Sequence, residues 1–416
     1  MPVQRRFRLG ACALALALSM PAMAQSAKPD AAVLAAAQRS RAGATALLEQ
    51  LVNIDSGTAN DAGIAKVAAV VTAELTKLGA KIETVSAAPA MGQNIVATFN
   101  GSGKTHILMM AHMDTVFADG TAQAHPFRVE GQRGYGPGIM DDKGGIVLAL
   151  YALKILKQTG FTDYGRITLL LNTNEETGSS GSRALIEKLA RQHDVTLNLE
   201  PGRVADGLVI WRKGSGEVTL DVRGKAAHAG VAPEAGRNAL TEAAHQVLQL
   251  GKLGDADKKT TINFTVLKTG EATNVIPDHV TAIADVRVAV PEEFDRVERD
   301  VARVAKNQLV AGTTVTTSLT RGFPPMPQNA ATDRLAATAQ AIYAEIGKKL
   351  TLEGTGGAAD ASLSAAAGTP TLDALGIVGG GIHTPEEYAD LDSIVPRLYL
   401  LSRLLVDTGS HPAPVR

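Results

Sequence analysis

The sequence contains little cysteine, few aromatic side chains and almost no net charge. Its 416 residues include one cysteine, Cys12, and one tryptophan, and aromatic residues make up 4% of the composition. A single cysteine excludes an intramolecular disulfide framework and a cysteine-rich metal site. Lysine and arginine together number 41, and aspartate and glutamate 42. This balance gives no indication of nucleic acid or an anionic membrane surface as a partner.

The N-terminus has the pattern of a secretory signal peptide covering residues 1–24. Three arginines precede residues 9–18, which are mostly alanine and leucine, and the small residues Ala22 and Ala24 stand where a signal peptidase reads the chain. The apolar segment is too short to span a membrane. We therefore expect cleavage after Ala24 and a mature chain that is periplasmic or secreted.

The mature chain of about 390 residues is longer than one hydrophobic core usually supports, so two domains are expected. Between residues 31 and 199, segments with helical periodicity alternate with short apolar runs. Four of these runs have the length and composition of buried strands: residues 94–99, 106–111, 166–172 and 195–199. A helix is expected over residues 144–157. The pattern predicts an α/β domain with helices on both faces of its sheet.

From residue 216 the pattern changes. The expected order is strand, helix, strand, strand, helix, strand, which is the β-α-β-β-α-β order of the ferredoxin-like module. The six elements are expected at residues 217–223, 234–250, 261–268, 280–288, 292–309 and 313–319. We therefore predict a smaller domain, residues 214–322, inserted into a larger one formed by residues 25–213 and 323–416. Gly214 and the pair Pro324-Pro325 mark the expected hinges.

Polar side chains that can bind a metal follow several predicted strands of the larger domain. His112 and Asp114 follow one strand, Glu175 and Glu176 a second, and Glu200 a third. The carboxyl ends of neighbouring parallel strands meet at one edge of a sheet, so we expect these side chains to lie close together. Residues i and i+2 of an extended chain point the same way, so Asp114 can orient the ring of His112.

Two glycine-rich segments add further candidates. Asp141 and Asp142 lie in the first, residues 136–145, at the start of a predicted helix. Adjacent carboxylates repel each other unless a cation lies between them, although aspartate at this position is also typical of a helix N-cap. The second segment, residues 379–387, contains His383. Two histidines together with several carboxylates form a donor set suited to zinc or another divalent metal.

These residues stand in motifs that resemble, in chain order, those of the M20 metallopeptidases. The resemblance covers essentially the whole mature chain and is nearest to the secreted bacterial glutamate carboxypeptidases of the carboxypeptidase G type. The motifs are His112-Met113-Asp114-Thr115-Val116, Gly138-Ile139-Met140-Asp141-Asp142-Lys143-Gly144-Gly145, Asn174-Glu175-Glu176-Thr177-Gly178-Ser179, Glu200-Pro201, Gly224-Lys225-Ala226-Ala227-His228-Ala229-Gly230 and His383-Thr384-Pro385-Glu386-Glu387.

The resemblance implies a zinc-exopeptidase-type catalytic domain with a mixed sheet and two zinc ions per chain. It assigns five residues as metal ligands: His112 and Glu200 for one ion, Glu176 and His383 for the other, and Asp141 as the bridge between them. Asp114 would orient His112. Glu175 would be the general base, because a carboxylate outside the coordination shell can accept a proton and return it to the leaving amine.

The same resemblance implies that the inserted domain is a lid and forms the interface of a homodimer. His228 would stabilise the tetrahedral oxyanion, often in the active site of the partner subunit. Asn274 and Arg287 would hold the carboxylate of the substrate. Without the resemblance, His228 is also compatible with an exposed loop, and Arg287 with a surface charge.

Two further positions bear on substrate choice. Glutamate-cleaving members of this group carry basic residues where Leu208 and Phe323 align, so glutamate preference is in doubt and an apolar C-terminal residue is an alternative. Burying a substrate carboxylate without a partner charge is costly. Four cations are candidates to replace the missing pair: Arg203, Arg212, Lys213 and Arg321.

The sequence therefore predicts a secreted dinuclear zinc carboxypeptidase that releases a C-terminal amino acid, with glutamate as one candidate, from small peptides or N-acyl amino acids. An M20-type aminoacylase, deacetylase or dipeptidase is the alternative within the family. The non-enzymatic alternative is a periplasmic solute-binding protein, which also combines a signal peptide with two lobes but would bind no stoichiometric zinc.

Overall fold

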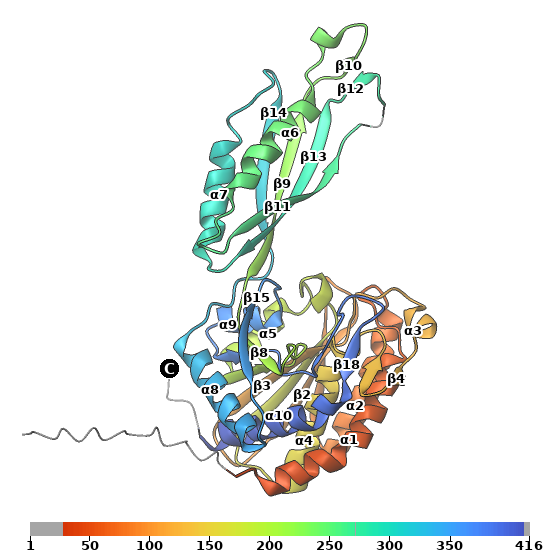
Figure 1. Cartoon of the computed structure of the whole chain (residues 1–416), viewed down its shortest axis with the longest axis vertical. Helices are drawn as coiled ribbons and strands as arrows, with labels where there is room; N and C mark the ends of the chain where they lie inside the picture. Colours follow the sequence, from red (N-terminus) through yellow and green to blue (C-terminus); the bar gives the residue numbers. More distant parts are fainter. Residues whose placement is uncertain (1–27, 271, 412–416) are drawn as a thin grey trace, which may run out of the picture.

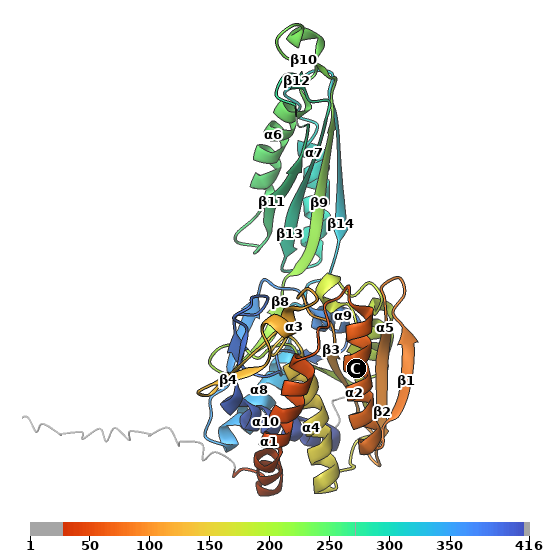
Figure 2. The same cartoon turned by 90° about the vertical axis from the view of Figure 1, so that its right-hand side faces the viewer.

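The computed structural model describes residues 28–270 and 272–411, so the predicted signal peptide lies outside the described residues. The chain forms a larger domain and an elongated smaller domain that projects from it (Figures 1 and 2). Within the described ranges, no helix combines the length and the apolar character needed to cross a membrane.

The larger domain is built on a six-stranded mixed sheet. Its strand order is β1 (Lys81–Ser86), β2 (Gln93–Asn100), β6 (Arg166–Asn172), β3 (His106–His112), β7 (Val195–Asn198) and β16 (Thr371–Leu372). The last four strands run parallel to one another, whereas β1 and β2 form an antiparallel edge. The four strands predicted in this region are confirmed to within one or two residues.

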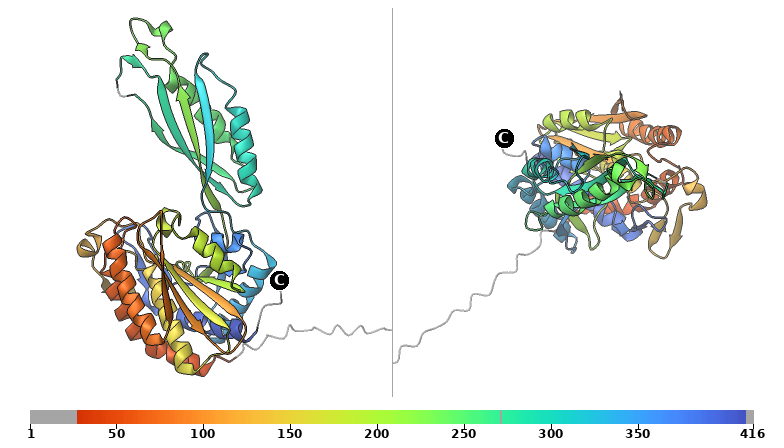
Figure 3. Two further views of the ribbon diagram at one scale, coloured as in Figure 1. Left: turned by 180° about the vertical axis from the view of Figure 1, so that it is seen from behind. Right: turned by 90° about the horizontal axis from the view of Figure 1, so that it is seen from above.

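Helices cover both faces of this sheet, as predicted (Figure 3). The first layer contains α1 (Ala31–Val52), α2 (Asp61–Leu78), α4 (Lys143–Thr159) and α10 (Ile394–Ser410), and the second contains α5 (Arg183–Arg191) and α9 (Asp360–Ala366). Because side chains alternate along a strand, Ile107 and Met109 of β3 pack into the first layer. Leu108 and Met110 pack into the second. An additional helix, α8 (Ala330–Glu345), packs beside β16 and α10.

Several short elements of the larger domain were not predicted from the sequence. β8 (Gly207–Arg212) pairs in parallel with β15 (Thr351–Thr355). A separate four-stranded sheet contains β17 (Gly379–Gly380), β18 (Tyr388–Asp390), β5 (Arg133–Tyr135) and β4 (Arg128–Glu130), and a short helix, α3, covers Thr121–Ala124. The pairing of β18 with β5 brings the second glycine-rich segment beside the first.

The smaller domain contains an antiparallel four-stranded sheet with two helices packed on one face. Its strand order is β11 (Thr261–Lys268), β13 (His279–Val288), β9 (Gly214–Arg223) and β14 (Thr314–Arg321). The helices are α6 (Ala239–Leu250) and α7 (Glu292–Val304), and their apolar faces share a core with the sheet. This arrangement is compatible with the predicted β-α-β-β-α-β module. A two-stranded ribbon, β10 (Ala227–His228) and β12 (Val275–Ile276), forms the end furthest from the larger domain (Figure 1).

The predicted bounds of both helices in the smaller domain were wrong at one end. The segment Pro233–Ala235 forms a separate 3-10 turn, and α6 begins only at Ala239. Asn238 fixes this start, because its side chain accepts hydrogen bonds from the backbone N–H groups of Leu240 at 3.0 Å and Thr241 at 3.1 Å. The second helix ends at Val304 rather than at residue 309.

The two chain segments that connect the domains run next to each other, at the positions where the hinges were expected. Ser215 donates its backbone N–H to the carbonyl of Phe323 at 3.0 Å, and Gly322 donates to the carbonyl of Ser215 at 2.8 Å. A Cβ atom at Gly214 would lie 2.6 Å from the backbone nitrogen of Pro325. Such close approach of two backbones requires glycine at this position.

Candidate metal centre

The five predicted metal ligands lie together at the carboxyl edge of the central sheet. They come from the ends of β3 and β7, the turn after β6, the turn before α4 and the loop before β18. They form two groups of three, His112 with Asp141 and Glu200, and Asp141 with Glu176 and His383, in each of which the ligand atoms lie within 4.8 Å of one another. Asp141 belongs to both groups.

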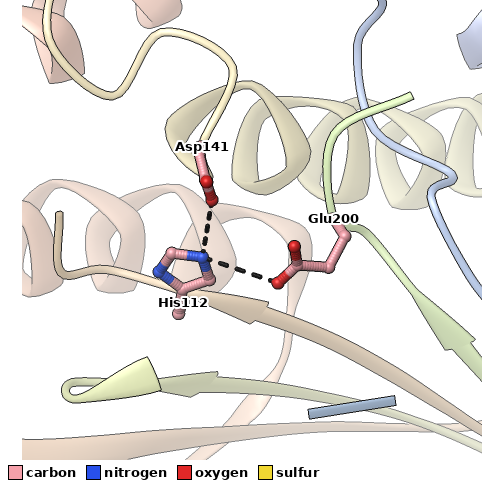
Figure 4. A group of neighbouring side chains, drawn as sticks. All are labelled: His112, Asp141 and Glu200. Atoms are coloured by element: carbon pink, nitrogen blue, oxygen red, sulfur yellow. Dashed lines mark hydrogen bonds and ion pairs between the residues drawn. The ribbon is translucent and has the colours of Figure 1, made fainter. Parts of the chain in front are cut away.

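Figure 4 shows the first group, in which His112 and Asp141 are buried and the side chain of Glu200 is 12% exposed. His112 Nε2 lies 3.0 Å from Asp141 Oδ1 and 3.7 Å from Glu200 Oε1. A hydrogen bond fixes the orientation of the His112 ring: its Nδ1–H donates to the backbone carbonyl of Asp114 at 3.0 Å. This hydrogen bond leaves the lone pair of Nε2 directed at the two carboxylates, as a metal ligand requires.

The second group uses the other oxygen of Asp141. His383 Nε2 lies 3.2 Å from Asp141 Oδ2 and 3.3 Å from Glu176 Oε2. The two oxygens of Asp141 therefore face two different histidines. The side chain of His383 is 50% exposed, whereas that of His112 is 2% exposed, so the centre opens to solvent on the side of His383.

The donor geometry fits bound divalent cations. Tetrahedral zinc with ligand bonds of about 2.0–2.1 Å places neighbouring ligand atoms roughly 3.4 Å apart. The four separations among these side chains, 3.0, 3.7, 3.2 and 3.3 Å, lie around this value. In addition, Glu176 Oε1 is buried and has no hydrogen-bond partner. A buried carboxylate oxygen without a partner is costly unless a cation compensates it.

The concentration of carboxylates in the centre also favours binding of a cation. Burial opposes a positive charge on His112, but hydrogen bonds to Asp114 and Asp141 raise its pKa well above the ordinary value. Hydrogen bonds to Asp141 and Glu176 raise the pKa of His383 to about 10. Burial and the charge of Asp141 raise the pKa of Glu200 to about 8. The cluster thus carries an excess of carboxylates that favours uptake of positive charge.

Asp114 connects the first group to the turn after β6. Its carboxylate accepts hydrogen bonds from the backbone N–H groups of Glu175 at 3.1 Å and Glu176 at 3.3 Å, and from the Thr58 hydroxyl at 2.7 Å. Asp114 Oδ1 also lies 3.4 Å from His112 Nδ1. The predicted orienting residue therefore contacts His112 through both its carbonyl and its carboxylate, and it fixes the backbone that carries both glutamates.

Glu175 belongs to neither group of ligands, although it lies beside them. Its side chain is partly buried, and burial followed by the charge of Glu200 raises its pKa well above the ordinary value. Consecutive side chains of the turn diverge, so Glu176 reaches His383 while Glu175 does not enter the ligand set. A carboxylate in this position can exchange protons without giving up a metal bond.

The alternative of helix capping does not account for Asp142. This residue occupies the N-cap position of α4, but its side chain makes no capping hydrogen bond. Asp142 is fully buried, and its Oδ2 accepts from the backbone N–H of His112 at 3.3 Å. Burial raises its pKa well above the ordinary value. Asp142 thus contacts the backbone of a ligand, and the peptide bond that joins it to Asp141 is cis.

Sequence reasoning missed the buried ion pair behind Glu200. Arg212 Nη2 lies 3.7 Å from Glu200 Oε2, and Arg212 Nε pairs with the carboxylate of Asp373. Arg212 also donates to the carbonyl of Gly357 at 3.2 Å. Arg212 was a candidate for binding a substrate carboxylate, but its guanidinium already has these partners. The sequence gives no signal for this pair, because Asp373 lies 161 positions away.

Leu208 and Phe323, the two positions where glutamate-cleaving members carry basic residues, are both buried among apolar side chains. Leu208 has no exposed surface and packs in the main hydrophobic core. Phe323 is 7% exposed and packs in the second layer, with the Arg183 guanidinium 5.6 Å from its ring centre. The apolar surroundings of Leu208 would disfavour a cation there, and the space beside the Phe323 ring already holds the Arg183 guanidinium. Their apolar character therefore reflects core packing.

The remaining candidate cations differ in their partners. Arg203 lies 3.8 Å from Glu353, and Arg321 pairs with Asp295 and Glu298 of the smaller domain at 2.6 and 2.8 Å. For Lys213, no ion pair with another residue of the described ranges is found. Burial, followed by the charges of Lys259 and Arg287, lowers the pKa of Lys213.

Of the three predicted residues of the smaller domain, His228 and Asn274 lie at one end and Arg287 at the other. His228 in β10 and Asn274 in the turn before β12 are both exposed at the far end of the domain. His228 Nδ1 accepts from the backbone N–H groups of Gly230 at 3.2 Å and Val231 at 3.1 Å, so its Nε2 carries the proton and can donate. Arg287 lies at the hinge end, opposite Ser215 of β9, and pairs with the carboxylate of its neighbour Asp285 at 2.9 Å.

Comparisons with known proteins identify the family of this chain. The profile of peptidase family M20/M25/M40 matches residues 108–407. Carboxypeptidase G2 from Pseudomonas sp. (strain RS-16) is 42% identical over 367 residues, which cover 87% of this chain and 88% of that protein. The crystal structure of aminopeptidase PepT from Bacillus cereus has a TM-score of 0.76 at 25% identity and covers 88% of this chain and 98% of that one.

Human carnosine dipeptidase 1 shares the fold, with a TM-score of 0.67 at 15% identity over 91% of this chain and 99% of that one. The predicted resemblance to the M20 metallopeptidases is thus confirmed. Because the family profile and the similarity to carboxypeptidase G2 each cover most of the sequence, this chain belongs to peptidase family M20/M25/M40.

Proposed function

We propose that this protein is an exported carboxypeptidase that binds two zinc ions per chain and hydrolyses the amide bond before a C-terminal amino acid. The observation that carries the proposal is the pair of ligand groups joined by the two oxygens of Asp141. His112 and Glu200 would complete one zinc site, and Glu176 and His383 the other. Family membership favours an enzyme over the solute-binding protein considered from the sequence.

The residues of the chain have distinct tasks in this mechanism. Metal ions bound to the two groups would supply Lewis acidity and lower the pKa of water. Glu175 accepts the proton of the attacking water and delivers it to the leaving amine. The hydrogen bonds of Asp114 fix the position of His112 relative to the turn that carries Glu175. His228 donates its Nε2–H to the tetrahedral oxyanion.

The separation of residues within the smaller domain supports a homodimer in which one lid completes the site of its partner. From His279 to Arg287, β13 extends over roughly 27 Å at about 3.4 Å per residue. Asn274 and His228 lie beyond its far end, so one lid cannot bring Asn274 and Arg287 to the same carboxylate. In a symmetric dimer, the terminal ribbon of one subunit would reach the site of the other.

Mixed dimers test this arrangement. We expect the single variants Glu175→Ala and His228→Ala to be nearly inactive. When the two are unfolded together and refolded in equal amounts, random pairing makes about half of the dimers mixed, each with one complete site, so about a quarter of the native activity should return. Wild-type protein taken through the same procedure is the control. If the mixture stays inactive while the control recovers, each site is self-contained.

The preferred leaving residue is proposed to be glutamate. Leu208 and Phe323 are buried in apolar clusters. Their apolar character is therefore no evidence that the substrate pocket is apolar. Lys213 lies near Arg287 and has no acidic partner within ion-pair distance among the described residues. It is therefore the candidate to pair with the side-chain carboxylate of the substrate, while Arg287 and the partner subunit's Asn274 hold the α-carboxylate.

A substrate panel tests this preference. Zinc-loaded enzyme is assayed on N-acyl amino acids and dipeptides that differ only in the C-terminal residue. We expect kcat/KM for glutamate to exceed that for glutamine and leucine by about 10- to 100-fold, because an unpaired cation discriminates against neutral groups. Lys213→Met should reduce this ratio. Equal rates for the three residues would contradict the glutamate assignment, and activity only on free dipeptides would identify a dipeptidase.

Export remains a proposal based on residues 1–24. Mass spectrometry of the mature protein from its native host should find an N-terminus at Gln25, the residue after the expected cleavage site. Retention of the full N-terminus in the purified native protein would contradict it.

A further inference from the structure

We propose that Glu387 is the positioning residue that holds Asp141 and His383 in the relative geometry that two bound cations need. This inference rests on the proposed metal-dependent function. Glu387 lies four residues after His383, just before β18. Its side chain is 1% exposed, and it was not singled out in the sequence beyond its place in a motif.

The carboxylate of Glu387 is surrounded by backbone N–H groups of the first glycine-rich turn. Its Oε1 accepts from Met140 at 2.8 Å and from Asp141 at 3.1 Å, and its Oε2 accepts from Gly138 at 3.0 Å. The backbone carbonyl of Glu387 also accepts from Gly136 at 3.3 Å. One residue thus accepts hydrogen bonds from four backbone N–H groups of the turn that ends at Asp141, those of residues 136, 138, 140 and 141.

The turn needs such a partner because it cannot satisfy these groups itself. Gly136 and Gly138 have φ values of +148° and +70°, and the whole turn is buried beneath the start of α4. The N–H groups before a helix have no intrahelical acceptor, and a buried N–H without a partner is strongly disfavoured. On the opposite side of the turn, Lys143 donates to the carbonyl of Pro137 at 3.2 Å.

Glu387 connects this turn to the loop that carries the exposed histidine. The backbone N–H of Glu387 donates to the carbonyl of Thr384 at 3.1 Å, which closes the loop immediately after His383. Asp141 and His383 are far apart in sequence, yet Asp141 Oδ2 lies 3.2 Å from His383 Nε2. Loss of Glu387 would therefore loosen two of the three ligands of the second group. In the first group, His112 and Glu200 would still be supported by β3 and β7.

Zinc titration of the metal-free protein tests this asymmetry. In Glu387→Gln, the NH2 group of the new side chain replaces one carboxylate oxygen. This group donates hydrogen bonds and cannot accept one from a backbone N–H, so at least one of the three hydrogen bonds is lost. We expect affinity at the second group to fall by about 10- to 100-fold, as for other residues that orient metal ligands. Affinity at the first group should fall less, because only one of its three candidate ligands, Asp141, depends on Glu387. The variants His383→Ala and His112→Ala assign the two binding steps.

Hydrogen exchange of the metal-free protein provides a readout that does not depend on zinc. At least one of the amides of Gly138, Met140 and Asp141 should exchange at least about tenfold faster in Glu387→Gln, because each lost hydrogen bond removes protection. Glu386→Gln is the matched control, since Glu386 is the exposed neighbour and should leave both readouts unchanged. If Glu387→Gln does not fold, Glu387→Asp is measured in the same way.

Two results would overturn the proposal: an equal loss of affinity at both groups, or unchanged exchange of the three amides. If the wild-type protein binds no zinc, the proposed metal-dependent function fails, and the exchange experiment still decides whether Glu387 holds the turn.

Discussion

Replacing Glu175 with glutamine is expected to abolish nearly all turnover while the metal content stays unchanged. Glu175 lies outside both ligand groups, so its loss removes no metal bond. Glutamine has nearly the same shape but cannot accept the proton of water and pass it on. General acid–base catalysis by one side chain typically contributes 10²–10⁴-fold, so kcat should fall by about three orders of magnitude. Steady-state kinetics and elemental analysis of the same preparation check both parts.

The adjacent residue provides a matched control. Glu176 carries the same carboxyl group one position further along the turn, but its Oε2 lies 3.3 Å from His383. Glu176→Gln should lose metal from the second group, so its activity should respond to added zinc. The activity of Glu175→Gln should not. If Glu175→Gln kept more than about a tenth of the native kcat, the general base would have to be another residue.

The sequence was sufficient to predict four of the six strands of the sheet, and the edge at which the candidate ligands meet, for one physical reason. Strands such as 106–111 and 166–172 are continuous apolar runs, and polar residues directly after such runs lie at the same edge of a parallel sheet. This local pattern marks the places of His112, Glu176 and Glu200, whereas their assignment as metal ligands came from the family resemblance. Their partner His383 lies on a loop outside any long strand, and only its motif drew attention to it.

The contacts that hold these ligands were less accessible to prediction. Arg212 with Asp373, and Glu387 with the turn before Asp141, join segments more than 150 positions apart. Nothing in the local sequence distinguishes a buried arginine from one that binds substrate, which is why Arg212 was considered for that role. Likewise, the burial of Leu208 depends on the parallel pairing of β8 with β15, and that pairing was not predicted.

Removing the side chain of Asp141 is expected to abolish metal binding in both groups at once. Each group has three protein ligands, and three is the number that catalytic zinc sites normally require. Asp141→Ala leaves two ligands in each, so both zinc ions should be lost and activity should be undetectable. His383→Ala, in contrast, removes a ligand from one group only and should retain one zinc ion per chain. Elemental analysis and calorimetric titration of both variants measure this difference.

The comparison of these two variants decides whether Asp141 is shared. Its Oδ1 lies 3.0 Å from His112 and its Oδ2 3.2 Å from His383, so each oxygen has its own histidine. If Asp141 served one group only, Asp141→Ala would keep one tightly bound zinc ion, as His383→Ala should. Such a result would separate the two groups and remove the main support for a bridged two-metal centre. Loss of both ions from Asp141→Ala, with one retained by His383→Ala, requires a single carboxylate to serve both groups.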